Sequence, residues 1–123
     1  MKKISLSFAL LSLCLVAVAA NTKIGALVKA ADKFDGKSVT TAGTVTHFQA
    51  KTSKKGNKYF VFELEEGSDT VNLYGRGELK AAPHDGQKVQ VSGKFEKEHK
   101  LPTFSVKNQI TIANEKDIKV LSK

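Results

Sequence analysis

The sequence predicts a mainly β domain in which five strands form a small closed barrel, with a short N-terminal helix after a signal peptide. Three observations support this fold class. After Gly36, apolar and polar residues alternate in five segments, as in strands with one buried face. Glycines stand inside two of these segments, at positions 43 and 93, where they let a strand bend sharply enough to close a sheet. Before Gly36 the apolar residues follow a helical period instead.

The first 20 residues have the layout of a secretory signal peptide. Two lysines precede a long uncharged apolar stretch that ends in small residues, so we expect a mature chain that begins at Ala20 or Asn21. The apolar stretch, residues 4–20, also reaches the lower limit of about 17–25 residues for a membrane span, and a membrane anchor is the alternative. Leu13 before Cys14 does not fit a lipoprotein signal. The expected location is periplasmic or secreted.

Composition limits the remaining possibilities. Cys14 is the only cysteine and leaves with the signal peptide, so the mature protein has no disulfide and no thiolate metal site. The remaining 123 − 20 = 103 residues form one domain, large enough to bury a core. Its 18 basic and 12 acidic residues give a charge of +6, from +8 for the whole chain. This excess of positive charge favours an anionic partner. The alternative is that the excess of lysine only keeps an exported protein soluble.

The segment before Gly36 predicts a short amphipathic helix over about residues 22–33, capped by Asn21 or Thr22. Its apolar residues recur at helical spacing: Ile24, Leu27, Val28 and Ala31. The sequence Asp35-Gly36 is expected to end it.

The five strands are expected within residues 37–49, 58–64, 69–75, 87–97 and 103–112. We assign four phenylalanines on their apolar sides to the core: Phe60, Phe62, Phe95 and Phe104. Phe48 breaks the alternation, and a bulge is expected to turn it inward. Residues 65–68 form a tight acidic turn, whereas residues 76–86 are long enough for a helical turn. Five bent strands with an insert between the third and fourth predict a Greek-key OB-fold barrel.

Several motifs in residues 36–121 also resemble a known family. They are a glycine in the first strand, the hairpin "KKGNKYFVFELEEG" and "GQKVQVSGKF" in the fourth strand. This pattern resembles OB-fold nucleic-acid-binding domains of the tRNA-anticodon-binding type, as in small exported bacterial OB-fold proteins. The resemblance implies an OB-fold domain over residues 36–123, after a helix and lead-in over residues 21–35. Because OB-folds host many activities, it implies the function less strongly than the fold.

The candidate site combines lysines with aromatic rings. Four lysines fall in the loop between the first two strands, and residues 36–62 contain no acidic residue. In an OB-fold this loop flanks the ligand-binding mouth, whose floor is the outer face of strands two and three. Cations that follow phosphates and rings that stack on bases are the components of single-strand binding. We predict a nucleic-acid site of Lys51, Lys54, Lys55, Lys58, Tyr59, Asn72, Tyr74 and Arg76.

One nearby acidic residue and two simpler interpretations weigh against this site, whereas the acidic turn does not. The acidic turn lies roughly 20 Å from the lysines along the second strand, beyond the Debye length of about 8 Å. Glu63, however, shares the outer face with Tyr59 and would repel a phosphate. The lysines could also be ordinary solvated surface, and Tyr59 and Tyr74 could form a cross-strand pair that needs no ligand.

No other chemistry is indicated by the sequence. The three histidines lack the spacing of a zinc or copper site, so we expect no metal and no cofactor. No catalytic motif is present, and we expect a binding protein and not an enzyme. The alternative to nucleic-acid binding is a periplasmic module that binds a protein, through β-augmentation, or a small ligand, in envelope stress or assembly. A third possibility is an acidic glycan or lipid head group.

Overall fold

A computed structural model describes residues 21–122, so the predicted signal peptide lies outside the described residues. The elements, in chain order, are α1 (Ile24–Lys29), α2 (Ala31–Phe34), β2 (Ser38–Thr52), β3 (Lys58–Glu66), β4 (Asp69–Arg76), β5 (Lys88–Lys100), β6 (Ser105–Ile112), the 3-10 helix η2 (Glu115–Asp117) and β7 (Ile118–Ser122). In the described part of the chain, no helix is both long and apolar enough to cross a bilayer.

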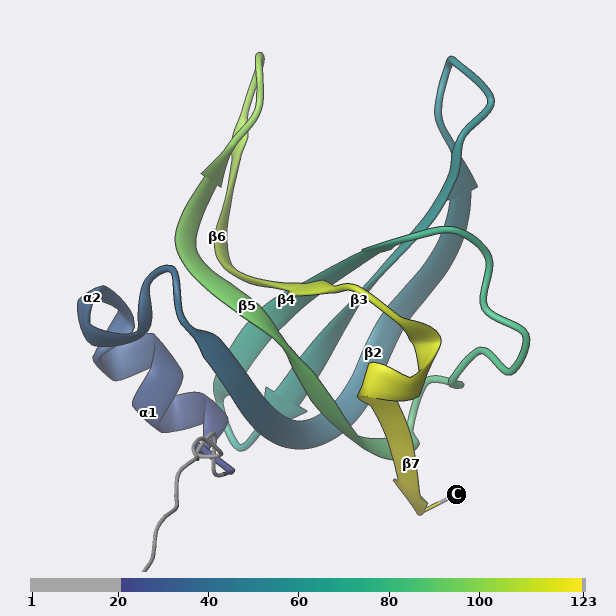
Figure 1. The fold of residues 1–123 in the computed structure, drawn as a ribbon. Coiled ribbons are helices and arrows are strands. Elements are labelled where there is room, and N and C mark those ends of the chain that lie inside the picture. The colour runs from purple at the N-terminus through teal and green to yellow at the C-terminus, as the bar shows by residue number, and fades with distance from the viewer. Residues whose placement is uncertain (1–20, 123) are drawn as a thin grey trace, which may run out of the picture.

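Five of the strands pair into a closed ring (Figure 1). The antiparallel pairs are β2–β3, β3–β4, β6–β5 and β5–β2, and the parallel pair β4–β6 completes the ring. The mainly β prediction is therefore confirmed, with five strands in the ring. The prediction missed β7, a short sixth strand that pairs with β5. Its Val120 and Leu121 are adjacent and both about half exposed, so it carries no alternating pattern.

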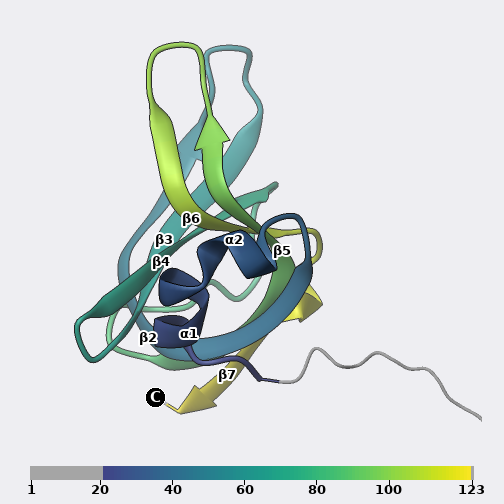
Figure 2. The ribbon, with the colours of Figure 1, turned by 90° about the vertical axis from the view of Figure 1, so that its left-hand side faces the viewer.

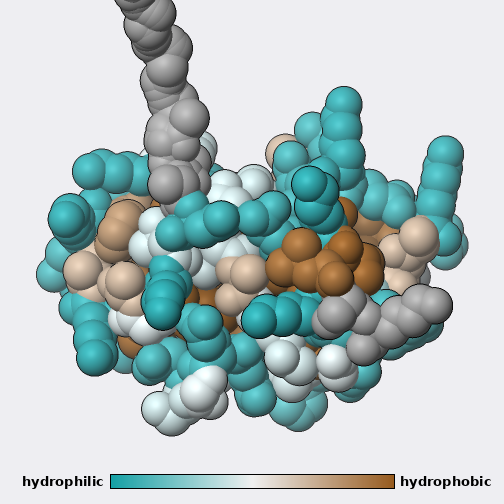
Figure 3. All heavy atoms as spheres, turned by 90° about the horizontal axis from the view of Figure 1, so that it is seen from below, coloured by the Kyte–Doolittle hydropathy of each residue, from teal (hydrophilic) through white to brown (hydrophobic). Residues whose placement is uncertain are grey.

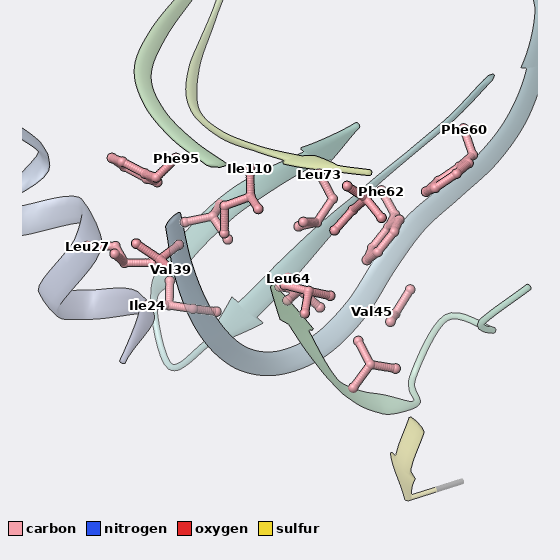
Figure 4. Packing of buried hydrophobic residues seen from close by; sticks show 14 of the residues in the cluster. Ile24, Leu27, Val39, Val45, Phe60, Phe62, Leu64, Leu73, Phe95 and Ile110 are labelled. Carbon is pink, nitrogen blue, oxygen red and sulfur yellow. The ribbon is translucent and has the colours of Figure 1, made fainter. Parts of the chain in front are cut away.

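Apolar side chains from α1 and from the ring strands fill the interior (Figure 4). Phe62, Phe95 and Ile110 point into this space and are at most 2% exposed. From the helix, Ile24 and Leu27 are fully buried against the same cluster. The helix therefore covers the core beside the curved first half of β2, as Figure 2 also shows.

A bulge in β2 turns Phe48 toward the core, as predicted. The β2–β3 register shifts between Thr46 and Gln49, and His47 adopts a left-handed backbone conformation with φ 55°. The Phe48 ring then lies 5.8 Å from that of Phe62, between centroids. The bulge thus adds an aromatic side chain to the core from a position that simple alternation assigns to the opposite face.

Glycines inside β2 and β5 allow neighbouring backbones to approach closely. A Cβ atom on Gly93 would lie 2.2 Å from the carbonyl oxygen of Thr111, and one on Gly43 would lie 2.8 Å from that of Glu65. Both distances are far below van der Waals contact. The predicted role of these residues in closing the sheet is therefore supported, because a side chain at either position would push adjacent strands apart.

The prediction of one helix over residues 22–33 is wrong in two respects. Ala30, with φ −116° and ψ 42°, divides it into α1 and α2. The N-cap is Lys23, with no side-chain capping hydrogen bond, so neither predicted residue caps the helix. Asn21 instead forms a parallel bridge with Thr40 of β2. The Thr22 N–H also donates to the carbonyl oxygen of Thr40 at 2.8 Å, so the residues before the helix extend the sheet.

Two further expectations are wrong. Phe104 is 61% exposed and does not belong to the core, because the β5–β6 hairpin continues beyond the ring. Asn108 of β6 has a left-handed φ of 52°, and the alternation of the strand breaks there.

The connection after β4, over residues 77–87, forms no helical turn. It is held by Glu115, whose carboxylate accepts hydrogen bonds from the backbone N–H groups of Lys80 and Ala81, both at 3.0 Å.

Candidate nucleic-acid interface

The outer face of β3 carries a row of basic and aromatic side chains. Lys51 of β2 stands opposite Tyr59 of β3, and Tyr59 stands opposite Arg76 of β4. Directly opposed residues of antiparallel strands project on the same side of the sheet. Three residues predicted from distant parts of the sequence therefore share one face, with a cation on either side of an aromatic ring.

The second tyrosine lies next to this row. Tyr74 is opposite Val61, and its ring contacts that of Tyr59 with centroids 5.8 Å apart and planes tilted by 38°. Both tyrosines are half-buried, which leaves part of each ring accessible. The cross-strand pair is thus present, and it forms a small aromatic platform on the predicted floor.

Asn72 and Glu63 form the next row of the same face. The Asn72 side-chain amide donates to the carbonyl oxygen of Lys107 at 2.8 Å, so it joins β4 to β6. The Glu63 carboxylate lies 3.1 Å from Nδ1 of His47. This row therefore provides a structural amide and a negative charge, and it marks the acidic limit of the platform.

Lys58 is separated from the predicted group. It is opposite Thr52 and adjacent to Tyr59 along β3, so it projects on the other side of the hairpin. Its Nζ lies 3.4 Å from the Glu78 carboxylate, and both side chains are exposed. Lys54 and Lys55 lie in the turn at the end of the hairpin and are exposed.

Two hairpins extend beyond the ring on the same side (Figures 1 and 2). We call residues 51–58 the first arm and residues 97–107 the second arm. The second arm ends in a tight turn in which the Leu101 N–H donates to the carbonyl oxygen of Phe104 at 2.8 Å. Sequence reasoning missed this arm because it placed Phe104 in the core. Pro102 at the turn, two residues after Lys100, is the signal from which an exposed hairpin end could have been predicted.

A shallow depression of about 640 Å³ continues the platform around the ring. Thr111 of β6 lies at its border, opposite Tyr74 on one side and Lys94 on the other. Its wall includes the hydroxyls of Thr40 and Ser92, which are 2.9 Å apart. The outer face is therefore continuous from the tyrosines to this depression.

Residues 21–122 include histidine and carboxylate side chains, which are potential metal ligands. Among them, no three His, Cys, Asp or Glu side chains are grouped so that they could hold an ion. The imidazole of His99 lies 3.2 Å from the Glu96 carboxylate of its own strand.

No protein-family model matches the sequence, and no curated protein matches it. Solved structures that share its fold include the following two. A structure of yeast Stn1 and Ten1 matches with a TM-score of 0.60 and 13% identity, over 87% of this chain and 65% of that chain. A chain described as an aspartyl-tRNA synthetase from Leishmania major Friedlin matches with a TM-score of 0.59 and 14% identity, over 92% of this chain and 22% of that one. The chain thus spans slightly less than two thirds of the first and a small part of the second, and the likeness supports an OB-type fold.

Proposed function

We propose that the domain binds single-stranded nucleic acid across the outer face of β3 and β4, between the two arms. The observation that carries this proposal is the row of Lys51, Tyr59 and Arg76, with the Tyr74 ring beside it. Cations on both sides of the row pair with successive phosphates while the rings accept bases. Such stacking contributes about 1–3 kcal/mol per base.

The chain's charge distribution and one structural neighbour support the proposal. Residues 36–62 include Lys51, Lys54 and Lys55 and contain no acidic residue. The synthetase that shares the fold takes tRNA as a substrate, by its name. This neighbour is only 14% identical to the chain, and one fold hosts many functions. It therefore supports nucleic acid as the class of ligand for this chain and nothing more specific.

The positions of the predicted residues divide them by role. Lys51, Lys54, Lys55 and Arg76 are the proposed phosphate contacts, whereas Tyr59 and Tyr74 are the proposed stacking residues. Two members of the predicted set are left out of these roles. Lys58 pairs with Glu78 on the other side of the hairpin, and the Asn72 side chain joins β4 to β6 by a hydrogen bond.

Titration of a labelled single-stranded oligonucleotide at several salt concentrations tests the proposal. Four phosphate contacts at about 0.7 each predict that log K falls with log salt at a slope near −3. A competing double-stranded DNA of the same sequence should bind more weakly, because its paired bases cannot reach the rings. An affinity that does not change with salt would contradict the proposal.

The first arm offers a matched pair of variants for this titration. Lys51→Gln and Lys58→Gln remove the same charge from opposite sides of one hairpin. Only Lys51→Gln should reduce the affinity and lower the salt slope by about 0.7. Equal effects would mean that the hairpin acts through net charge alone, with no defined platform.

A second candidate function, binding of a protein partner, is favoured by β7. This strand pairs with β5 on one edge, and its Val120 is 49% exposed. It lies on the side away from the arms, where Figure 3 shows hydrophobic atoms among hydrophilic ones. An extended partner segment could add to this edge by β-augmentation. Pull-down with and without nuclease separates the candidates, because protein partners survive the nuclease.

We also propose that the protein acts after export and has no catalytic activity. The lysine pair, apolar stretch and small residues of positions 1–20 support export, and the lack of a catalytic motif supports a binding role. N-terminal sequencing of the protein recovered from each cell fraction tests the first point. A chain that retains Met1 and fractionates with the cytosol would contradict it.

A further inference from the structure

The end of the second arm has apolar side chains that the nucleic-acid proposal does not use. Phe104 is 61% exposed and Leu101 is 38% exposed. The hydrogen bond between their backbones places them opposite each other across the turn that contains Pro102. A leucine offers no flat face for a base. Two apolar side chains and a proline at the far end of a hairpin indicate contact with an apolar phase.

Basic residues lie beside these side chains and at the end of the other arm. Lys100 precedes Leu101 and is opposite the neutral Ser105. Lys54 and Lys55 occupy the turn of the first arm, in a stretch without acidic residues. The acidic Glu98 is opposite Lys107, farther from the turn, where the two charges offset each other. Both arms therefore end in uncompensated positive charge.

The arrangement of the arms fits a flat partner. Both arms project on the same side of the ring and end at a similar level (Figures 1 and 2), so a plane touches both ends at once. A single nucleic-acid strand would instead follow the platform between them. We infer that the ends of the two arms dock on a bilayer that contains anionic lipid. Leu101 and Phe104 enter the interface, and Lys54, Lys55 and Lys100 pair with lipid phosphates.

This mode of binding combines two contributions to the binding free energy, each of which is weak alone. Amphipathic surfaces of this kind bind through buried apolar area together with attraction to anionic lipid. Lysine stems lie along the apolar layer while their ammonium groups stay at the head groups. Each lysine near the surface changes the partition coefficient about fivefold. Binding should therefore be reversible and should require both anionic lipid and the apolar pair.

The absence of tryptophan from the sequence permits a local test. Phe104→Trp in the full chain introduces a single indole at the end of the second arm. With vesicles of equal parts phosphatidylglycerol and phosphatidylcholine, its emission should shift to the blue and be quenched by acyl-brominated lipid. Phosphatidylcholine vesicles should give little response, and salt should reverse the shift. Because the indole reports only on the arm, contact of residues 1–20 with lipid does not mimic this result.

A variant pair provides the control. Leu101→Ser combined with Phe104→Ser should lower the affinity for the anionic vesicles about tenfold or more, with an unchanged melting temperature because both residues are exposed. Tyr59→Ala combined with Tyr74→Ala should leave vesicle binding intact.

An indole that does not respond to anionic vesicles overturns the inference. An indole that oligonucleotide quenches while vesicles leave it unchanged also overturns it, and assigns the arm to nucleic acid. Both proposals use Lys54 and Lys55, but the inference does not rest on the proposed function, since the pair Leu101 and Phe104 is varied for vesicle binding and the pair Tyr59 and Tyr74 for oligonucleotide binding. Failure of one leaves the other standing.

Discussion

The rings of Tyr59 and Tyr74 lie in contact on the outer face, 5.8 Å apart and tilted by 38°. They come from adjacent strands, β3 and β4, one register row apart. The contact stabilises the hairpin whether or not a ligand binds, and it also holds both rings in one orientation. Stability and binding measurements on the same variants can separate these two roles.

The double-mutant cycle of Tyr59→Ala and Tyr74→Ala should show a stability coupling of about 0.2–1 kcal/mol, as for other cross-strand pairs. Each single variant should also weaken oligonucleotide binding by about 1–3 kcal/mol, because one stacking surface is lost. Denaturant titration and fluorescence anisotropy provide the two measurements. Coupling in stability without any loss of binding would mean that the pair is purely structural.

Glu63 limits the affinity of the platform, so its removal should improve binding. Glu63→Gln should tighten oligonucleotide binding by roughly two- to fivefold, since one like-charge contact near a surface is worth about 1 kcal/mol. Glu66→Gln is the control: it removes the same charge from the same strand about 10 Å away, beyond the Debye length of about 8 Å. If both variants have the same effect, Glu63 does not face the ligand.

Two phenylalanines that the sequence pattern assigns to the core should differ sharply in how much the protein loses in stability when each is replaced by alanine. Phe95→Ala should cost about 3–5 kcal/mol, as for other buried rings replaced by alanine, because Phe95 is fully buried. Phe104→Ala should change the free energy of unfolding by no more than about 0.5 kcal/mol, as for an exposed position. Urea denaturation measures both. A large cost for Phe104→Ala would place this ring against the core.

Acid should weaken the attachment between Glu115 and the loop after β4. The hydrogen bonds from the Lys80 and Ala81 backbone N–H groups lower the pKa of Glu115 below its ordinary value. Because the folded-state pKa is the lower one, the stabilisation is present above the ordinary pKa of glutamate. It is lost as the pH falls through the folded-state value.

Denaturation midpoints of the wild type and Glu115→Gln should therefore differ at neutral pH and converge in acid. Hydrogen exchange provides a local measurement, since the amides of Lys80 and Ala81 should lose protection in the variant at neutral pH. A difference between the two proteins that stays constant down to strong acid would contradict this assignment.

The sequence predicted the ring well because its signals are local. Alternation identified the five ring strands, and the glycines at positions 43 and 93 stand where a neighbouring backbone leaves no room for a side chain. The inward turn of Phe48 was also predicted, since an aromatic residue that breaks the alternation beside a histidine indicates a bulge.

The errors arose where the outcome depends on distant parts of the chain. Alternation places Phe104 on the apolar side of β6 but does not tell how far the hairpin continues beyond the ring. The predicted site grouped Lys58 with its neighbours in sequence, and only the register with Thr52 reveals that it projects on the other side of the hairpin; its role in binding stays a prediction. β7 has no alternating pattern, and only its pairing with β5 defines it.

Ring closure has a consequence for how the chain folds. The β2–β5 pair brings together residues such as Thr40 and Ser92, which are 52 positions apart. Topologies dominated by such non-local pairs fold in about milliseconds to seconds, so we expect ring closure to limit the folding rate. Each arm, by contrast, is closed by neighbours in sequence, which permits it to open and re-form while the ring stays intact. The arms, which are proposed to contact ligands, would then open and close much faster than the ring unfolds.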